Sequence, residues 1–280
     1  FLQWIYSPGI PNAELSVFSN PAGSVRVRAS SNSPTSTLFD LDIPLRIGGS
    51  AQPDSVLVRA TPQGCVSYFN YSQQNDISTL EVDPNHWLLL RQYTVHSQHL
   101  AMCLPYDQAV DVSWNAWPGP DQLSGYHVYR RQLPSGEWER ITDSPVQGLF
   151  YSDLNVVNGL TYEYRVSAVD AEGYLSLPSN TLQATPLDFP FDRGFLVVDE
   201  TRDGNGANIS PTDQMVDDFY AYVLGEFWHG NWDLASQGAP SLETLSHHPL
   251  VLWHCDDFTD MQIINNLNTL GSYVLSGGKL

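Results

Sequence analysis

Short alternating strands separated by turn residues fill the middle of this chain and constrain its fold more than any other feature. Candidate strands occupy residues 109–114, 126–131, 138–141, 150–153 and 159–170, and Pro and Gly gather between them. They recur at roughly ten-residue spacing, which is typical of a small antiparallel sandwich whose strands each bury one face. We therefore predict a mainly β, multidomain chain.

This pattern closely resembles a fibronectin type III module over residues 107–186. The resemblance implies that Trp114 is the core tryptophan of the second strand. It also implies that Leu160 and Tyr162 form a corner whose phenol hydrogen-bonds back to the main chain.

Four aromatic residues of this module, Trp117, Tyr126, Tyr129 and Trp138, form a possible binding surface. Aromatic rings stack on sugars and peptides, so a peptide or a carbohydrate is the candidate ligand. Aromatic residues in such positions also serve as cross-strand partners or core. The alternative role for the module is that of a spacer between domains.

Residues 1–106 are predicted to form a separate β-sandwich. Residues 1–11 read as the end of an apolar helix broken by Pro8-Gly9 and Pro11. Residues 37–47 alternate Phe39, Leu41, Ile43, Leu45 and Ile47 with mostly polar neighbours, which indicates a half-buried strand. Together with the Asp-Pro segment of residues 80–90, this order resembles the junction between the catalytic domain and the small β-sandwich of aminopeptidase N-like (gluzincin) zinc metallopeptidases.

The peptidase resemblance implies a parent protein whose catalytic chemistry lies elsewhere. The H-E-x-x-H motif of zinc peptidases is absent from these residues, so we assign no catalytic residue and no cofactor to the chain. Zinc is expected in a missing amino-terminal catalytic domain, which would be the chain's principal partner. The simpler interpretation is an amphipathic helix end that precedes an unrelated sandwich.

After a Pro-containing linker, residues 191–280 show a different pattern. Apolar strands at 195–198, 232–235 and 249–253 alternate with helical segments at 210–225, 241–245 and 259–275. A Ser-Pro pair at residues 210–211 predicts the start of the first helix. The β-α-β-α-β-α order predicts a partial α/β parallel-sheet, Rossmann-like domain. It resembles the first half of a flavodoxin-like domain of the glutamine-amidotransferase kind, truncated at residue 280.

Ligands of open α/β sheets bind at the carboxyl ends of strands. Here those ends carry Asp199 and Glu200 after the first strand, and His254, Cys255 and Asp257 after the third. A thiolate pair between Cys255 and His254 is one hypothesis. Against it, adjacent strand residues point to opposite faces, and neighbouring carboxylates raise the pKa of a thiol.

Asp199 and Asp203 precede Gly204 with a spacing that resembles a calcium loop. However, Thr201 stands at the third position of such a loop, and Ser210 stands at the twelfth, which should supply a bidentate Glu. The alternative is an ordinary turn after a strand.

Charge and cysteine content limit the partners. A net charge of −19 with 12 Lys+Arg argues against nucleic acid, because phosphate binding needs clustered cations. A run of about eighteen apolar residues, the least that spans a membrane, is lacking. Cys65 and Cys103 could pair in an oxidising compartment. Composition indicates an exported bacterial protein that is secreted, periplasmic or on the cell surface, and the start at Phe1 and the stop at Leu280 suggest a chain cut at both ends.

These observations lead to two interpretations of function. The first is a non-catalytic accessory fragment of an exported zinc metallopeptidase-like protein, with scaffold and spacer domains. The alternative is a cell-surface adhesion or carbohydrate-binding protein without peptidase activity.

Overall fold

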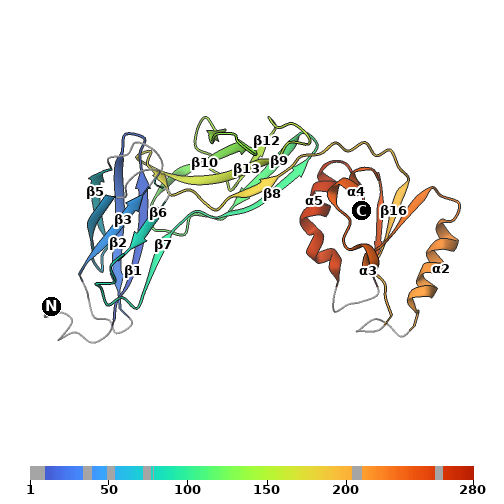
Figure 1. Ribbon diagram of the computed structural model, residues 1–280, viewed down its shortest axis with the longest axis horizontal. Helices are drawn as coiled ribbons and strands as arrows, with labels where there is room; N and C mark the ends of the chain where they lie inside the picture. The colour runs from blue at the N-terminus through green and yellow to red at the C-terminus, as the bar shows by residue number, and fades with distance from the viewer. Residues whose placement is uncertain are drawn as a thin grey trace.

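A computed structural model describes residues 10–33, 40–48, 54–71, 77, 79–203, 210–255 and 261–280. Figure 1 shows two β-sandwiches in a row, followed by a region in which helices flank a small sheet. The helix end expected in residues 1–9 lies outside the described residues.

The first sandwich packs two sheets over one core. Its strands are β1 (Asn12–Ser19), β2 (Ser24–Asn32), β3 (Leu41–Gly48), β4 (Asp54–Ala60), β5 (Cys65–Asn70), β6 (Thr79–Val82) and β7 (Gln92–His96). Strands β7, β1, β2 and β5 form one sheet, and β4, β3 and β6 form the other. Leu41, Ile43, Leu45 and Ile47 all point into the core and are at most 3% exposed. The predicted alternation in β3 is therefore confirmed at these four positions.

The second sandwich has the topology that its short strands predict. Its strands are β8 (Leu100–Tyr106), β9 (Ala109–Trp114), β10 (Leu123–Gln132), β11 (Glu139–Arg140), β12 (Phe150–Asp153), β13 (Tyr162–Asp170), β14 (Leu175–Ser176) and β15 (Leu182–Ala184). Trp114 lies in the core at 3% exposure. The Tyr162 hydroxyl accepts a hydrogen bond of 3.0 Å from the Val157 amide, which confirms the tyrosine corner. Strand β8 pairs with β9, so the sandwich includes strand residues before position 107.

One strand joins the two sandwiches. Strand β1 of the first sandwich pairs antiparallel with β14 of the second through Phe18 and Ser176, and through Ser19 and Leu175. A continuous sheet therefore runs from β11 through β13 and β14 to β1 and β5. Because main-chain hydrogen bonds fix both partners, the sandwiches share more than a linker.

The third region is built on a parallel sheet in the order β17-β16-β18. Its elements are β16 (Phe195–Asp199), α2 (Asp213–Leu224), β17 (His229–Asp233), α3 (Leu234–Gln237), α4 (Leu242–Ser246), β18 (Val251–His254), the 3-10 helix η1 (Gln262–Asn266) and α5 (Leu267–Leu275). Leu196, Val198 and Val251 of the sheet share one core cluster with Leu245 of α4 and Leu270 of α5. Helix α2 flanks the sheet away from α4 and α5 (Figure 1).

Two predicted helix boundaries in the third region are wrong. Helix α2 begins at Asp213 rather than at Ser210-Pro211, because Thr212 caps it by accepting from the Met215 amide. The helix predicted over residues 259–275 is a 3-10 turn followed by α5. The Gln262 amide, at the start of that turn, is held by the Glu200 carboxylate.

The three cysteines form no disulfide. Cys65 lies on β5 of the first sandwich and Cys103 on β8 of the second, so the pairing considered from the sequence would have to cross between sandwiches. Burial raises the pKa of the Cys103 thiol to about 12. Among the described helices, none is long and apolar enough to span a membrane.

Candidate functional site

The four aromatic residues of the predicted binding surface separate into two pairs. Tyr126 is 6% exposed, and its ring lies 5.5 Å from that of Trp114 in the core. The Trp117 ring packs edge-on against Phe18 at 5.2 Å, and the Trp117 amide donates to the Tyr126 hydroxyl. Trp117 therefore contacts the first sandwich at the junction, and Tyr126 supports it from the core of the second.

Tyr129 and Trp138 lie on another part of the second sandwich, where arginines cover their rings. The Arg165 guanidinium lies 5.4 Å from the Tyr129 ring centre and 4.4 Å from that of Trp138. The Arg131 guanidinium lies 4.8 Å from the Trp138 ring centre. Such cation–π contacts occupy ring surface that a sugar or peptide would need. The structure thus does not bring the four aromatic residues into one platform.

In the third region, the carboxyl ends of β16 and β18 bring Asp199 and His254 together. The two residues are register partners, and the His254 Nδ1 lies 3.6 Å from the Asp199 Oδ1. The His254 ring stacks on Tyr220 of α2 at 4.1 Å. This ring contact links the sheet to the helix above it.

Glu200 is a buried hydrogen-bond acceptor, and Cys255 lies just past the end of β18. Glu200 is 6% exposed and accepts a hydrogen bond of 2.6 Å from Trp253 Nε1, as well as one from the Gln262 amide. Cys255 follows β18 and is half-buried. Asp257 lies outside the described residues. Among the predicted residues that the structure describes, Asp199 and Glu200 both lie beside His254, because the Glu200 main-chain amide donates to the His254 carbonyl at 3.0 Å.

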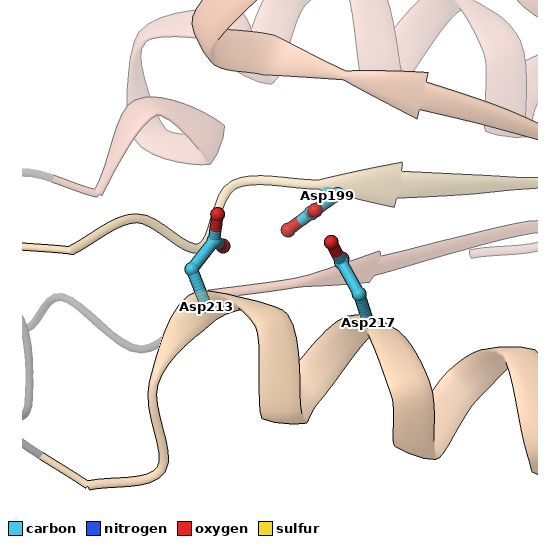
Figure 2. A group of neighbouring side chains, drawn as sticks. All are labelled: Asp199, Asp213 and Asp217. Carbon is cyan, nitrogen blue, oxygen red and sulfur yellow. The ribbon is translucent and has the colours of Figure 1, made fainter.

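Two carboxylates that the sequence reasoning missed complete a cluster with Asp199. Figure 2 shows Asp213 and Asp217 of α2 pointing toward Asp199, and one oxygen of each of the three lies within 4.8 Å of the others. The Thr201 hydroxyl lies within hydrogen-bonding distance of both Asp199 and Asp213. The i, i+4 spacing of Asp213 and Asp217, just after a strand and loop, was the signal that could have revealed them.

The environment of Asp217 favours its protonated form more than that of an isolated carboxyl group does. Partial burial, a hydrogen bond to Asp199 and the negative charges of Asp199, Asp213 and Asp218 raise the pKa of Asp217 to about 6. Three carboxylates at this separation also suit a hard cation such as calcium. Asp203 of the predicted calcium loop is not among them, because its carboxylate accepts from the Asp213 amide at 3.0 Å and supports the start of α2.

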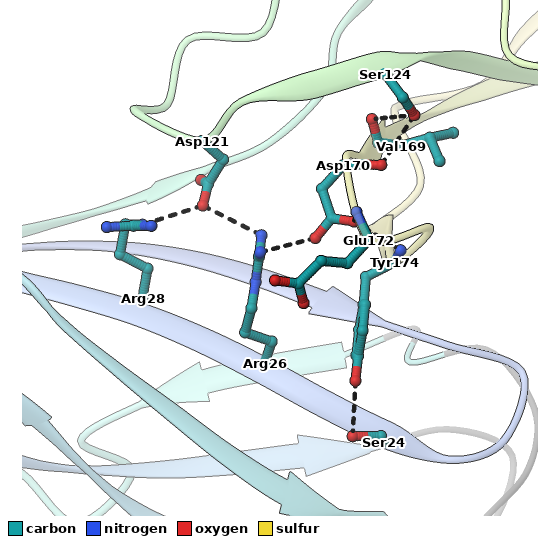
Figure 3. A network of polar contacts seen from close by, with 9 residues as sticks. All are labelled: Ser24, Arg26, Arg28, Asp121, Ser124, Val169, Asp170, Glu172 and Tyr174. Carbon is teal, nitrogen blue, oxygen red and sulfur yellow. Dashed lines mark hydrogen bonds and ion pairs between the residues drawn. The ribbon is translucent and has the colours of Figure 1, made fainter.

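A buried ionic network forms the junction between the sandwiches. Figure 3 shows Arg26 of β2 reaching two carboxylates of the second sandwich, Asp121 at 3.2 Å and Asp170 at 2.8 Å. Both carboxylate side chains are 1% exposed, and that of Arg26 is 9% exposed. Arg28 adds a second contact to Asp121 at 3.1 Å. Buried charges are tolerated in such a place because each has a partner.

Aromatic contacts surround this network. The Arg26 guanidinium lies 4.8 Å from the Phe18 ring centre and 6.0 Å from that of Tyr174. The Tyr174 hydroxyl is within 3.2 Å of the Ser24 hydroxyl, and the Tyr174 amide donates to Asp170. The turn that carries Asp170 is thus fixed to the first sandwich on both sides.

Part of this chain is similar in sequence to part of several amylopullulanases. No protein-family model matches the chain. An amylopullulanase of Thermoanaerobacter thermohydrosulfuricus is 39% identical over 77 residues, and one of Thermoanaerobacterium saccharolyticum is 44% identical over 64 residues. These matches cover 28% and 23% of this chain but 5% of each relative. The chain therefore spans about one-twentieth of the length of these relatives.

Among solved structures, a fibronectin type III-like protein from Clostridium thermocellum is 25% identical with a TM-score of 0.27. That match covers 32% of this chain and 94% of the other. The second sandwich is fibronectin type III-like. Its strand topology, core tryptophan and tyrosine corner all agree with that assignment.

The predicted relationship to aminopeptidase N-like metallopeptidases is wrong. Three of the chain's relatives are amylopullulanases and another is a cardiac-type myosin-binding protein C of Homo sapiens, and none of these four is a peptidase. The features that suggested a peptidase, a half-buried strand and a turn containing Asp-Pro, are general properties of β-sandwiches. The expectation of a zinc peptidase domain as the chain's partner rested on this relationship and is not kept.

Proposed function

We propose that this chain is a non-catalytic accessory region of an exported carbohydrate-active enzyme, in which the two sandwiches form a rigid spacer. The observation that carries the proposal is the junction. Strand β1 belongs to both sandwiches, and Arg26 binds two carboxylates of the second sandwich in a buried site. Domains in contact move relative to each other by default unless their interface is extensive, and a shared sheet opposes such motion.

The amylopullulanase relatives support the carbohydrate-active part of this proposal. A spacer of fixed geometry would hold a catalytic domain at a set distance from a polymer surface or from a second module. The alternative role is direct carbohydrate binding, which the same relatives favour over adhesion to a protein.

For residues 191–280 we propose a doubly wound, flavodoxin-like topology. The sheet order β17-β16-β18 corresponds to strands 2-1-3 of that fold. Lys279 pairs in parallel with Leu250 beside β18, where the fourth strand of that order belongs. The Asp199 cluster would then lie at the carboxyl ends of the strands, beside the switch in strand order.

The test uses the natural protein that carries this chain. Residues 12–184 are deleted, and hydrolysis of polymeric pullulan is compared with hydrolysis of a short soluble oligosaccharide. A spacer predicts a loss of rate on the polymer while the rate on the oligosaccharide is kept. Deletion of residues 191–280 alone is the control. Absence of glycoside hydrolase activity from the natural protein would contradict the proposal, and so would the same fractional change in rate on both substrates after the deletion.

A further inference from the structure

A polar pocket lies at the junction of the two sandwiches, apart from the sites described above. Its volume is about 260 Å³. The floor is the outer face of the sheet formed by β7, β1 and β2, one wall is the loop between β4 and β5, and the other wall comes from the second sandwich. The lining residues used below are Glu14, Ser16, Arg28, Gln63, His96 and Pro120.

Strand register explains why polar side chains share this floor. Ser16 of β1 is the register partner of Arg28 on β2 and of His96 on β7. Successive strand residues point to opposite faces, so Leu15 and Val17 enter the core of the first sandwich while Ser16 faces outward. Pro120 of the second sandwich and the loop between β4 and β5 flank this outward face, and Ser16 is 1% exposed at its floor.

Two buried polar atoms in the pocket lack a hydrogen-bond partner within the described parts of the chain. They are the Ser16 hydroxyl and the Nε2 of His96. The nearest carboxylate oxygen to that Nε2, on Glu14, is 3.7 Å away, which is beyond hydrogen-bonding distance. Buried polar groups are nearly always satisfied in folded proteins, so two orphans in one cavity indicate a polar occupant.

The charge distribution favours a neutral occupant. The Arg28 guanidinium is compensated by Asp121 at 3.1 Å. The Glu14 carboxylate accepts a hydrogen bond from the side-chain amide of Asn32, and His96 lies beside Glu14. A net anion or cation would therefore meet no excess of opposite charge. Hydroxyl, imidazole, carboxylate, guanidinium and amide groups around the same space can donate to and accept from several hydroxyls of one ligand.

Apolar surfaces of the pocket match the remaining part of such a ligand. Pro62 and Pro120 line the same space, and their rings can contact the C–H faces of a sugar ring. We infer that this junction pocket binds one or two sugar units of a neutral glycan through Ser16, His96 and Gln63. The inference rests on the proposed function, because it gives the spacer a glycan-contacting site.

The junction also explains why such a site would be preorganised. Its walls come from two sandwiches that β1 and Arg26 hold in one arrangement. A ligand therefore needs no domain closure to meet both walls, and the entropic cost of ordering the site has been met in folding.

The experiment titrates the full 280-residue chain with maltotriose, and separately with cellotriose, by isothermal calorimetry and saturation-transfer NMR. We expect saturable binding of at least one trisaccharide. Ser16→Ala should weaken it by about tenfold or more, because a hydroxyl partner is lost. Gln63→Ala changes an exposed loop residue and should weaken binding without affecting the fold. Ser55→Ala is the matched control, because Ser55 is exposed on β4 of the opposite sheet.

A thermal melt separates this role from a structural one. Removing an unsatisfied buried hydroxyl should leave the unliganded Ser16→Ala chain as stable as the parent or more stable. The inference would be overturned if neither trisaccharide binds saturably, or if Ser16→Ala and Gln63→Ala both bind as tightly as the parent chain. Either result leaves the spacer proposal standing, because the deletion experiment on polymeric substrate tests that proposal independently.

Discussion

The junction of the two sandwiches and the attachment of helix α2 in the third region show two ways of holding elements together. At the junction, Arg26 and its two carboxylate partners are at least nine-tenths buried and lie beside a shared sheet. Helix α2 buries no residue, and the described contacts that hold it include the Asp199 cluster and the ring of Tyr220 on His254. Buried ionic contacts resist salt and pH, whereas exposed carboxylates respond to both.

The same difference is seen in the exposed side chains of α2. Phe219 is 58% exposed and Tyr222 is 88% exposed, while Tyr273 of α5 on the other side of the sheet is fully buried. Local stability follows buried apolar contacts. We therefore expect the two sandwiches to behave as one cooperative unit and α2 to open separately.

The largest effect is expected from the core of the second sandwich. Trp114→Ala removes a buried ring and should lower the free energy of unfolding by about 3–5 kcal/mol. If the junction couples the sandwiches, calorimetry should show one transition for both, shifted as a whole. The exposed Trp87, at 75% exposure in the first sandwich, provides the control Trp87→Ala. Two separate transitions for the sandwiches in the parent chain would show that the junction does not couple their unfolding.

The next effect concerns the ionic network itself. Arg26→Met should cost about 3 kcal/mol, because the Asp121 and Asp170 carboxylates would stay buried with their main partner removed. Arg46→Met is the matched control, because Arg46 pairs with Glu81 on an exposed surface and such pairs contribute about 1 kcal/mol or less. Chemical denaturation of the three chains measures the difference. Equal losses from Arg26→Met and Arg46→Met would show that the junction is not held by its buried charges.

A smaller effect is expected from pH at the attachment of α2. The pKa of Asp217 is raised from 3.8 to about 6 in the folded chain, so the folded state binds this proton more tightly than the unfolded state. Its contribution to stability is therefore full below about pH 4 and is lost as the pH rises through about 6. Asp217→Asn should remove this dependence.

Hydrogen exchange of the α2 amides between pH 4 and pH 7 measures this effect, after correction for the intrinsic exchange rate. We expect protection of α2 to fall with rising pH in the parent and to stay level in Asp217→Asn. Glu226→Gln, at an exposed position just after α2 whose charge is not among those that raise the pKa of Asp217, is the control. Protection that is independent of pH in the parent would show that the carboxylate cluster does not control the helix.

The smallest effect is expected on the outer surface of α2. Tyr222→Ser should change the free energy of unfolding by no more than about 0.5 kcal/mol, because the side chain is 88% exposed. Tyr273→Phe on α5 should cost about 1 kcal/mol, because the hydroxyl donates to the His248 carbonyl at 2.8 Å. Thermal melts of both variants give the comparison. A larger loss from Tyr222→Ser would indicate that α2 has a packed partner.

Local sequence patterns determined much of this fold. Alternation in β3 placed Ile43, Leu45 and Ile47 in the core, and the strand-and-turn spacing of the second sandwich placed Trp114 and Tyr162. In the third region, the alternation of apolar strands with helical segments predicted the parallel strands, although the start of α2 was misplaced. Such features depend on neighbours within a few residues, and periodicity reports them directly.

The tertiary structure alone decided what the junction and the sites contain. Arg26 and Asp121 are 95 residues apart in sequence, and no local pattern on β2 or in the Asp121 loop signals their pairing. The same holds for β1 against β14, and for Ser16 and His96, which are neighbours because β1 pairs with β7. Asp213 and Asp217 join Asp199 because the first turns of α2 lie alongside the carboxyl end of β16 (Figure 2). Contacts of this kind arise from how whole elements pack, which the sequence of either partner does not specify alone.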